Sequence, residues 1–131
     1  MGSFYPTQDS AAAWQATSIA ASAVANSGNA ETAALSNNSK LGTEVSIAAA
    51  YGATATVGLK VYVLREVDTT TYEAVADKPY GFEMPFTVST THRRGFWVPH
   101  SFGAFKIRVE NASGASVTVT VKTRQQTGVT A

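Results

Sequence analysis

The last third of the chain alternates apolar and polar residues more regularly than any other part. Between residues 104 and 124 two alternating segments flank a turn at Asn111–Gly114. The apolar positions are Phe105, Ile107 and Val109 before the turn, and Val117, Val119 and Val121 after it. Because successive side chains of a strand point to opposite faces, this pattern predicts an antiparallel hairpin with one face toward solvent.

The rest of the chain contains shorter extended segments separated by turn residues. β-Branched and hydroxyl residues among the alanines of 14–29 favour strand there, with a helix over 11–25 as the alternative. Further strands are predicted at 30–35, 43–49, 56–67, 72–75, 82–88 and 96–99. Pro85 cannot donate a ladder hydrogen bond, so its strand is expected at a sheet edge or with a bulge.

These segments together predict the fold class. About eight strands at intervals near a dozen residues, with Gly, Pro and Asn turns between them, are typical of an all-β protein. We expect an antiparallel two-sheet β-sandwich, jelly-roll or Ig-like, over residues 14–131. Residues 1–13 are expected to form an extended N-terminal arm, since Pro6 and the polar residues after it interrupt regular structure.

Composition narrows the function classes. The 131 residues include 10 Lys and Arg against 9 Asp and Glu, a net charge of +1, which argues against a basic nucleic-acid-binding surface. The absence of cysteine excludes disulfides and thiolate zinc sites. No apolar run approaches the roughly 20 residues that span a bilayer, so we expect no membrane association. Because no secretion signal opens the chain, we expect the protein to mature in the cytoplasm.

Candidate chemistry is sparse. His92 and His100 are the only histidines, and two such residues without a fitting motif fall short of a zinc site. The acidic residues are scattered, and neither a GxSxG elbow nor a Gly-rich phosphate loop occurs. We therefore expect a protein that is not an enzyme and that has no cofactor and no metal.

The densest group of interaction-prone side chains lies near residue 95. Arg93 and Arg94 precede Phe96 and Trp97, and arginine and aromatic residues are enriched at protein interfaces. The simpler interpretation is that Phe96 packs inward while the two arginines form a solvated loop. Trp97 falls on the opposite face from Phe96 and is an interface candidate.

Several features together suggest a family resemblance. A charge-free segment rich in Ala, Ser, Thr and Asn at 16–29 leads through a Gly-containing loop at 50–53 to the closing alternation at 105–121. Over roughly residues 14–125 the chain resembles the small β-sandwich accessory proteins of tailed-phage virions, especially head decoration or cement proteins. The resemblance implies a non-enzymatic virion structural protein, made in the host cytoplasm, that binds the major capsid protein or another virion protein.

That resemblance also implies a homo-oligomer, most simply a trimer, that stabilises neighbouring capsomers. A low-charge arm can donate backbone hydrogen bonds to a neighbour's sheet edge, and exchanging it between copies closes a ring at low cost. Under this hypothesis Phe4, Tyr5 and Trp14 anchor the arm. Arg93, Arg94 and Trp97 then form a second contact surface.

The alternative is a carbohydrate- or receptor-binding module of a phage tail or fibre. Its aromatic stacking platform would comprise Tyr80, Phe82, Trp97 and Phe102, with polar contacts from Arg93 and His100. Exposed, coplanar rings would favour this function, and buried rings would exclude it. A pilus or surface-layer subunit also fits a sandwich, although such a protein usually needs a secretion signal.

Overall fold

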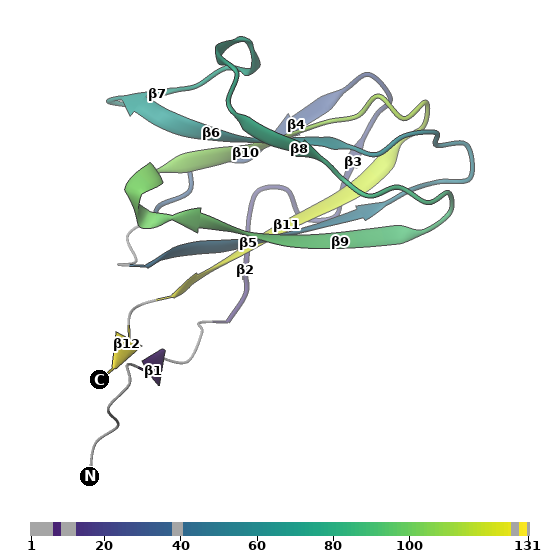
Figure 1. The fold of residues 1–131 in the computed structure, drawn as a ribbon. Helices are drawn as coiled ribbons and strands as arrows, with labels where there is room; N and C mark the ends of the chain where they lie inside the picture. The colour runs from purple at the N-terminus through teal and green to yellow at the C-terminus, as the bar shows by residue number, and fades with distance from the viewer. Residues whose placement is uncertain (1–6, 9–12, 38–40, 127–128, 131) are drawn as a thin grey trace.

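Two antiparallel β-sheets pack face to face in the computed structural model, which describes residues 7–8, 13–37, 41–126 and 129–130 (Figure 1). The first sheet comprises β4 (Asn29–Glu31), β10 (Phe105–Glu110) and β6 (Lys60–Asp68), with β7 (Thr71–Tyr72) and β8 (Tyr80–Glu83) both paired to the far side of β6. The second comprises β2 (Gln15–Ala16) and β3 (Ser22–Val24), both paired to β11 (Val117–Gln126), followed by β5 (Gly42–Ala50) and β9 (Thr91–Pro99). The predicted all-β sandwich is confirmed.

The order of the strands identifies the jelly-roll form of the sandwich. From β3 to β6, and again from β8 to β11, each strand lies in the sheet opposite to the strand before it. β2 and β3 follow one another within the second sheet, and β6, β7 and β8 within the first, where η1 (Val75–Asp77) connects β7 to β8. This alternation selects the jelly roll over the Ig-like arrangement, and it makes almost every strand pairing non-local in sequence.

The core lies between the two sheets and is built from the alternating apolar positions. Its largest fully buried side chains include Phe105, Ile107, Val109, Val61 and Val63 from the first sheet, and Val45, Ile47, Val117, Val119 and Val121 from the second. Burying each such side chain contributes about 1.5–3 kcal/mol relative to leaving it in water. The sequence pattern therefore identified correctly which residues of 105–121 face inward.

The predicted hairpin between 104 and 124 is wrong. β10 pairs with β4 and β6, whereas β11 pairs with β2, β3 and β5, so the two strands lie in opposite sheets. Period-two alternation determines which face of a strand is buried but does not select its hydrogen-bonded neighbour. Two consecutive strands that each have one apolar face can lie side by side in one sheet. They can equally lie in opposite sheets, with their apolar faces packed against each other across the core.

Asn111 holds the connection that takes the chain from one sheet to the other. Its side chain is buried, and its Nδ2 donates to the carbonyl oxygens of Val24 at 2.8 Å and Ala115 at 2.7 Å. Its Oδ1 accepts a hydrogen bond from the backbone N–H of Ser113 at 3.0 Å. The buried hydroxyl of Ser113 also donates to Ala115. The polar residues that resemble a hairpin turn in the sequence thus satisfy the backbone where it crosses the edge of the core.

Most of the other predicted strands exist with changed limits. The segment 14–29 contains β2 and β3, and no helix forms within the described residues 13–37, which confirms extended structure there. The predicted strand 56–67 begins only at Lys60, and Val57 before it is exposed. β8 ends at Glu83, two residues before Pro85, and pairs on one side only among the described strands, as the edge prediction required.

The simpler interpretation of Arg93 and Arg94, that they form a solvated loop, is wrong. Both residues lie inside β9, which pairs with β5 over its whole length. The sequence from Thr91 to Pro99 alternates in exposure, with Arg93, Gly95 and Trp97 outward. Two adjacent arginines are compatible with a strand because one points to solvent while the other lies at the margin of the sandwich.

Tyr51 satisfies a second buried backbone group. The N–H of Leu59 donates to the Tyr51 hydroxyl at 3.1 Å, and the Tyr51 ring meets Phe86 edge-on with a centroid distance of 5.0 Å. Burial raises the pKa of Tyr51, and the hydrogen bond from Leu59 partly opposes that rise. The phenol is therefore held in its neutral form inside the protein.

We expect Asn111→Ala to destabilise the fold by about 1–3 kcal/mol for each buried group that it leaves unpaired. The measurement is the midpoint of urea unfolding followed by circular dichroism. Asn29→Ala is the matched control, because Asn29 is exposed on β4. A midpoint unchanged from the wild type would contradict the role of Asn111 at the crossing.

We expect Tyr51→Phe to lower stability at neutral pH by about 1–3 kcal/mol, because the Leu59 N–H loses its acceptor. The raised pKa of Tyr51 also means that its contribution is fully present below the ordinary value of 10.0 and is lost as the pH rises through the folded-state pKa. Unfolding midpoints between pH 8 and 11 should thus fall less steeply for Tyr51→Phe than for the exposed control Tyr80→Phe. Parallel pH profiles for the two variants would show that Tyr51 does not cause the loss of stability at alkaline pH.

Candidate functional site

The outer face of the second sheet gathers aromatic and basic side chains from β5, β9 and β11 and from the residue that precedes β2. We call it the tryptophan face and define it by Trp14, Glu44, Ser46, Ala48, Arg93, Gly95, Trp97, Thr120, Lys122 and Arg124. The strand register sets its rows: Arg124 pairs with Glu44, and Glu44 pairs with Trp97. Trp14 joins the same row, because the next residue, Gln15, pairs with Thr123.

This row has an exposed tryptophan at each end. The exposed fractions of Trp14 and Trp97 are 38% and 42%. The guanidinium of Arg124 lies 4.4 Å from the centroid of the Trp14 ring and contacts one carboxylate oxygen of Glu44 through both Nε and Nη2, at 2.8 and 2.7 Å. Three strand spacings separate the tryptophans, so their Cα atoms lie on the order of 14 Å apart.

A shallow hollow lies next to this row. It has a volume of about 270 Å³ and is lined by Ser46, Ala48, Arg93, Thr120 and Lys122. Its floor consists of small and hydroxyl side chains. The two cations at its rim are exposed, and neither makes an ion pair with a carboxylate in the part of the chain that the structure describes.

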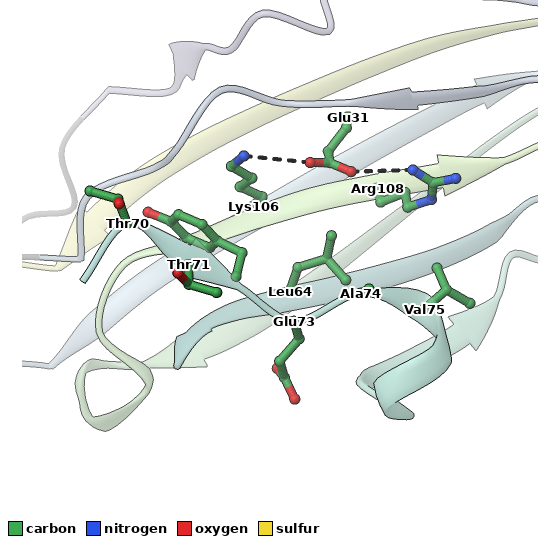
Figure 2. A pocket seen from close by; sticks show the side chains of 10 residues that line it. Glu31, Leu64, Thr70, Thr71, Glu73, Ala74, Val75, Lys106 and Arg108 are labelled. Carbon is green, nitrogen blue, oxygen red and sulfur yellow. Dashed lines mark hydrogen bonds and ion pairs between the residues drawn. The ribbon is translucent and has the colours of Figure 1, made fainter. Parts of the chain in front are cut away.

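The outer face of the first sheet holds a larger cleft of about 530 Å³ (Figure 2). The segment Thr70–Val75 covers Leu64 on this face. Glu31 binds both nearby cations, with Oε1 3.6 Å from Lys106 Nζ and Oε2 3.3 Å from Arg108 Nη1. The charged side chains that line the cleft are thus already paired, since Glu73 also binds Arg65 at 3.3 Å.

Tyr72 forms one wall of this cleft. The ammonium group of Lys106 lies 4.7 Å from the centroid of its ring, an arrangement that favours a cation–π contact. Burial and the neighbouring carboxylate of Glu66 raise the pKa of Tyr72, so its phenol is neutral at physiological pH. The Tyr72 ring therefore acts as a neutral aromatic surface whose contact with Lys106 already exists without a ligand.

The structure brings together three of the six interface candidates from the sequence. Trp14, Arg93 and Trp97 share the tryptophan face. Arg94 points to the other side of β9, where its guanidinium lies 4.0 Å from the centroid of the Phe82 ring. Phe4 and Tyr5 lie outside the described residues, so their role as anchors stays a prediction.

The predicted stacking platform of Tyr80, Phe82, Trp97 and Phe102 is not a single surface. Tyr80 and Phe82 lie on β8 in the first sheet, and their rings are inclined by 59° rather than coplanar. Phe102, in η2 (His100–Phe102), lies against Arg65 of the first sheet, and only Trp97 points outward from the second sheet. Alternation within β9 and the assignment of β8 to the other sheet separate these rings.

Sequence reasoning missed seven residues of the tryptophan face: Glu44, Ser46, Ala48, Gly95, Thr120, Lys122 and Arg124. They lie on three strands that are far apart in the sequence and are joined only by the jelly-roll pairing. The one available signal was the alternation of 43–49 and 117–124, which predicts outward positions for Glu44 and Lys122 but not their proximity.

The two histidines do not form a common site. His92 Nε2 lies 2.9 Å from the hydroxyl of Thr87, and His100 belongs to η2. Within residues 7–8, 13–37, 41–126 and 129–130, no three His, Asp or Glu side chains gather in a way that could hold a metal ion. No helical segment in these ranges reaches the length and hydrophobicity that crossing a bilayer requires.

Comparison with known proteins finds no matching family model and no matching curated protein. Solved structures with some similarity include a family 16 carbohydrate-binding module (17% identity, TM-score 0.40, covering 74% of this chain and 70% of that one). Others are a CBM35 from Paenibacillus barcinonensis (16%, 0.39, 99% of each chain) and a carbohydrate-binding module of Cellvibrio mixtus lichenase 5A in complex with cellotriose (10%, 0.36, 90% and 91%).

Proposed function

We propose that this chain is a non-catalytic carbohydrate-binding β-sandwich and that the tryptophan face binds the sugar chain. The observation that carries the proposal is the pair of exposed tryptophans, Trp14 and Trp97, at the two ends of one row across an open sheet face. Flat indole rings provide a large rigid contact area for the apolar faces of sugar rings. An open sheet face, unlike a closed pocket, can accept an extended polymer.

The composition of the tryptophan face favours a hydrated ligand over a protein partner. The centres of protein interfaces are apolar and depleted of lysine. On this face Arg124 and Glu44 lie between the two tryptophans, and the hollow beside that row is lined by Ser46, Ala48, Arg93, Thr120 and Lys122. Hydroxyl and cationic side chains are suited to hydrogen bonding with sugar hydroxyls, whereas a protein would leave several of them buried without partners.

The cleft on the first sheet is larger but is less suited to binding a sugar chain. Glu31 already binds Lys106 and Arg108, and Arg108 also contacts Glu110 at 3.1 Å. A ligand there would have to compete with these ion pairs for the same donors. The tryptophan face instead offers Arg93 and Lys122 with no such competition among the described residues.

We expect Trp97→Ala to weaken polysaccharide binding at least about tenfold, equivalent to about 1.4 kcal/mol. The measurement is affinity electrophoresis across a panel of soluble polysaccharides, followed by calorimetry with those that retard the wild type. The matched control is Tyr80→Ala, because Tyr80 is 54% exposed but lies on the other sheet. Equal retardation of Trp97→Ala and the wild type, or no retardation of the wild type by any polysaccharide, would refute the proposal.

A second candidate function is the virion accessory role that the resemblance of the sequence implies. It is favoured by one observation: β1 (Thr7–Gln8) and β12 (Val129–Thr130) pair with each other in a two-stranded sheet of their own, apart from the two sheets of the sandwich (Figure 1). Terminal strands that are not part of the core can exchange between copies of a chain. Under this proposal the protein binds a capsid or another virion surface as a trimer.

For this role we expect light scattering at two protein concentrations to give a mass of about three times 13.7 kDa. Deletion of residues 1–13 should reduce that mass to one chain, because it removes β1 and leaves β12 without a partner strand. Circular dichroism of the deletion variant checks that the sandwich remains folded. A single-chain mass for the wild type at both concentrations, or a trimeric deletion variant, would argue against assembly through the terminal strands.

A further inference from the structure

Gly95 occupies the middle of β9 although nothing in the fold requires a glycine there. A Cβ atom built at this position would meet only the backbone oxygen of Val45, at 3.7 Å, which is an ordinary van der Waals contact. By contrast, a Cβ at Gly58 would lie 2.1 Å from a backbone oxygen of Met84, and one at Gly81 would lie 2.7 Å from the Tyr62 ring. The φ angle of Gly95 is also not positive. Close packing explains the other two glycines but not Gly95.

A glycine inside a strand destabilises the strand relative to alanine, so an unneeded one points to another use. Gly95 faces outward on the tryptophan face, with Arg93 and Trp97 two residues away on either side. Its partner on β5 is Ser46, which lines the hollow. The missing side chain leaves a gap between the Arg93 and Trp97 side chains where a ligand can rest directly on the sheet.

The charge beside this gap is uncompensated. Arg93 and Lys122 border the hollow, while Glu44, the carboxylate of this face, is engaged by Arg124 at 2.7 Å. No other carboxylate among the described residues pairs with either cation. A guanidinium can bind a carboxylate or sulfate through two parallel hydrogen bonds, and an ammonium group adds a point charge.

We infer that the ligand of the tryptophan face is an acidic polysaccharide. One sugar ring stacks on Trp97 and extends over Gly95, and its carboxylate or sulfate group binds Arg93 and Lys122 across the hollow. This inference rests on the proposed carbohydrate-binding function and specifies the class of sugar. The shared chemistry is a single negative group on a sugar ring, which uronic acids and sulfated sugars both supply.

The first experiment compares four soluble probes in affinity electrophoresis and calorimetry: polygalacturonate, dextran sulfate, neutral dextran and single-stranded oligothymidylate. We expect binding to polygalacturonate or dextran sulfate, and whichever binds more tightly identifies the anionic group. Binding should weaken with added salt, because exposed charges are screened. If neutral dextran binds as tightly as the acidic polymers and Trp97→Ala abolishes that binding, the inference of an acidic ligand would be overturned. The proposed carbohydrate-binding function would then still stand. Equal binding of oligothymidylate would show a response to any polyanion and would overturn both.

The decisive variant is Gly95→Thr. Threonine is favoured in strands, and its side chain would fill the gap between Arg93 and Trp97. We expect an unchanged or higher urea midpoint together with a loss of affinity of about tenfold or more for the acidic polymer. A variant with wild-type affinity would overturn the inference. If threonine lowers the midpoint, Gly95→Ala replaces it, with a smaller expected loss of affinity.

A separate experiment tests the two cations without changing Gly95. Arg93→Gln and Lys122→Gln should each reduce affinity for the acidic polymer roughly three- to fivefold, the range expected for an exposed ion pair. The two substitutions together should abolish the salt dependence of binding. Lys60→Gln is the matched control, because Lys60 is exposed on the first sheet. Unchanged affinity and salt dependence in the double variant would exclude the two cations as the anion site.

Discussion

The packing of the two apolar inner faces across the sandwich is the constraint on which the rest of this structure depends. It requires β10 and β11, consecutive in the sequence, to lie in opposite sheets, and the chain crosses between them at Asn111. Asn111 makes this crossing possible because its buried amide binds three backbone groups that would otherwise lack partners. Once β11 is placed in the second sheet, it pairs with β2, β3 and β5 and so determines most of that sheet.

The tryptophan face is a direct consequence of this internal packing. Val45, Ile47 and Val121 are buried, so the residues between them on β5 and β11 must point outward. The long pairings of β5 with β9 and β11 then align these outward residues in rows. A candidate site built on the centre of a sheet in this way is held more rigidly than one built on loops, and its geometry needs no ligand to form.

Electrostatics divide the outer surface into two different regions. On the first sheet, two carboxylates (Glu31 and Glu73) and two cations (Lys106 and Arg108) line the cleft, and Glu31 pairs with both cations, so this cleft has little net charge to offer. On the outer face of the second sheet, Glu44 pairs with Arg124, and Arg93 and Lys122 have no carboxylate partner among the described residues. A chain whose net charge is only +1 can therefore still present a locally positive surface, because pairing rather than composition decides where charge is left over.

Alternation along a strand is a local property, so the amino-acid pattern alone was enough to identify the β-sandwich class, the inward residues of 105–121 and the outward position of Trp97. It could not determine that β10 and β11 belong to different sheets, since the same pattern fits a hairpin and a crossing. The grouping of Trp14, Gly95, Lys122 and Trp97 on one face also required the tertiary structure. These residues become neighbours only through pairing between distant strands, and such pairing is decided by how the whole core is filled.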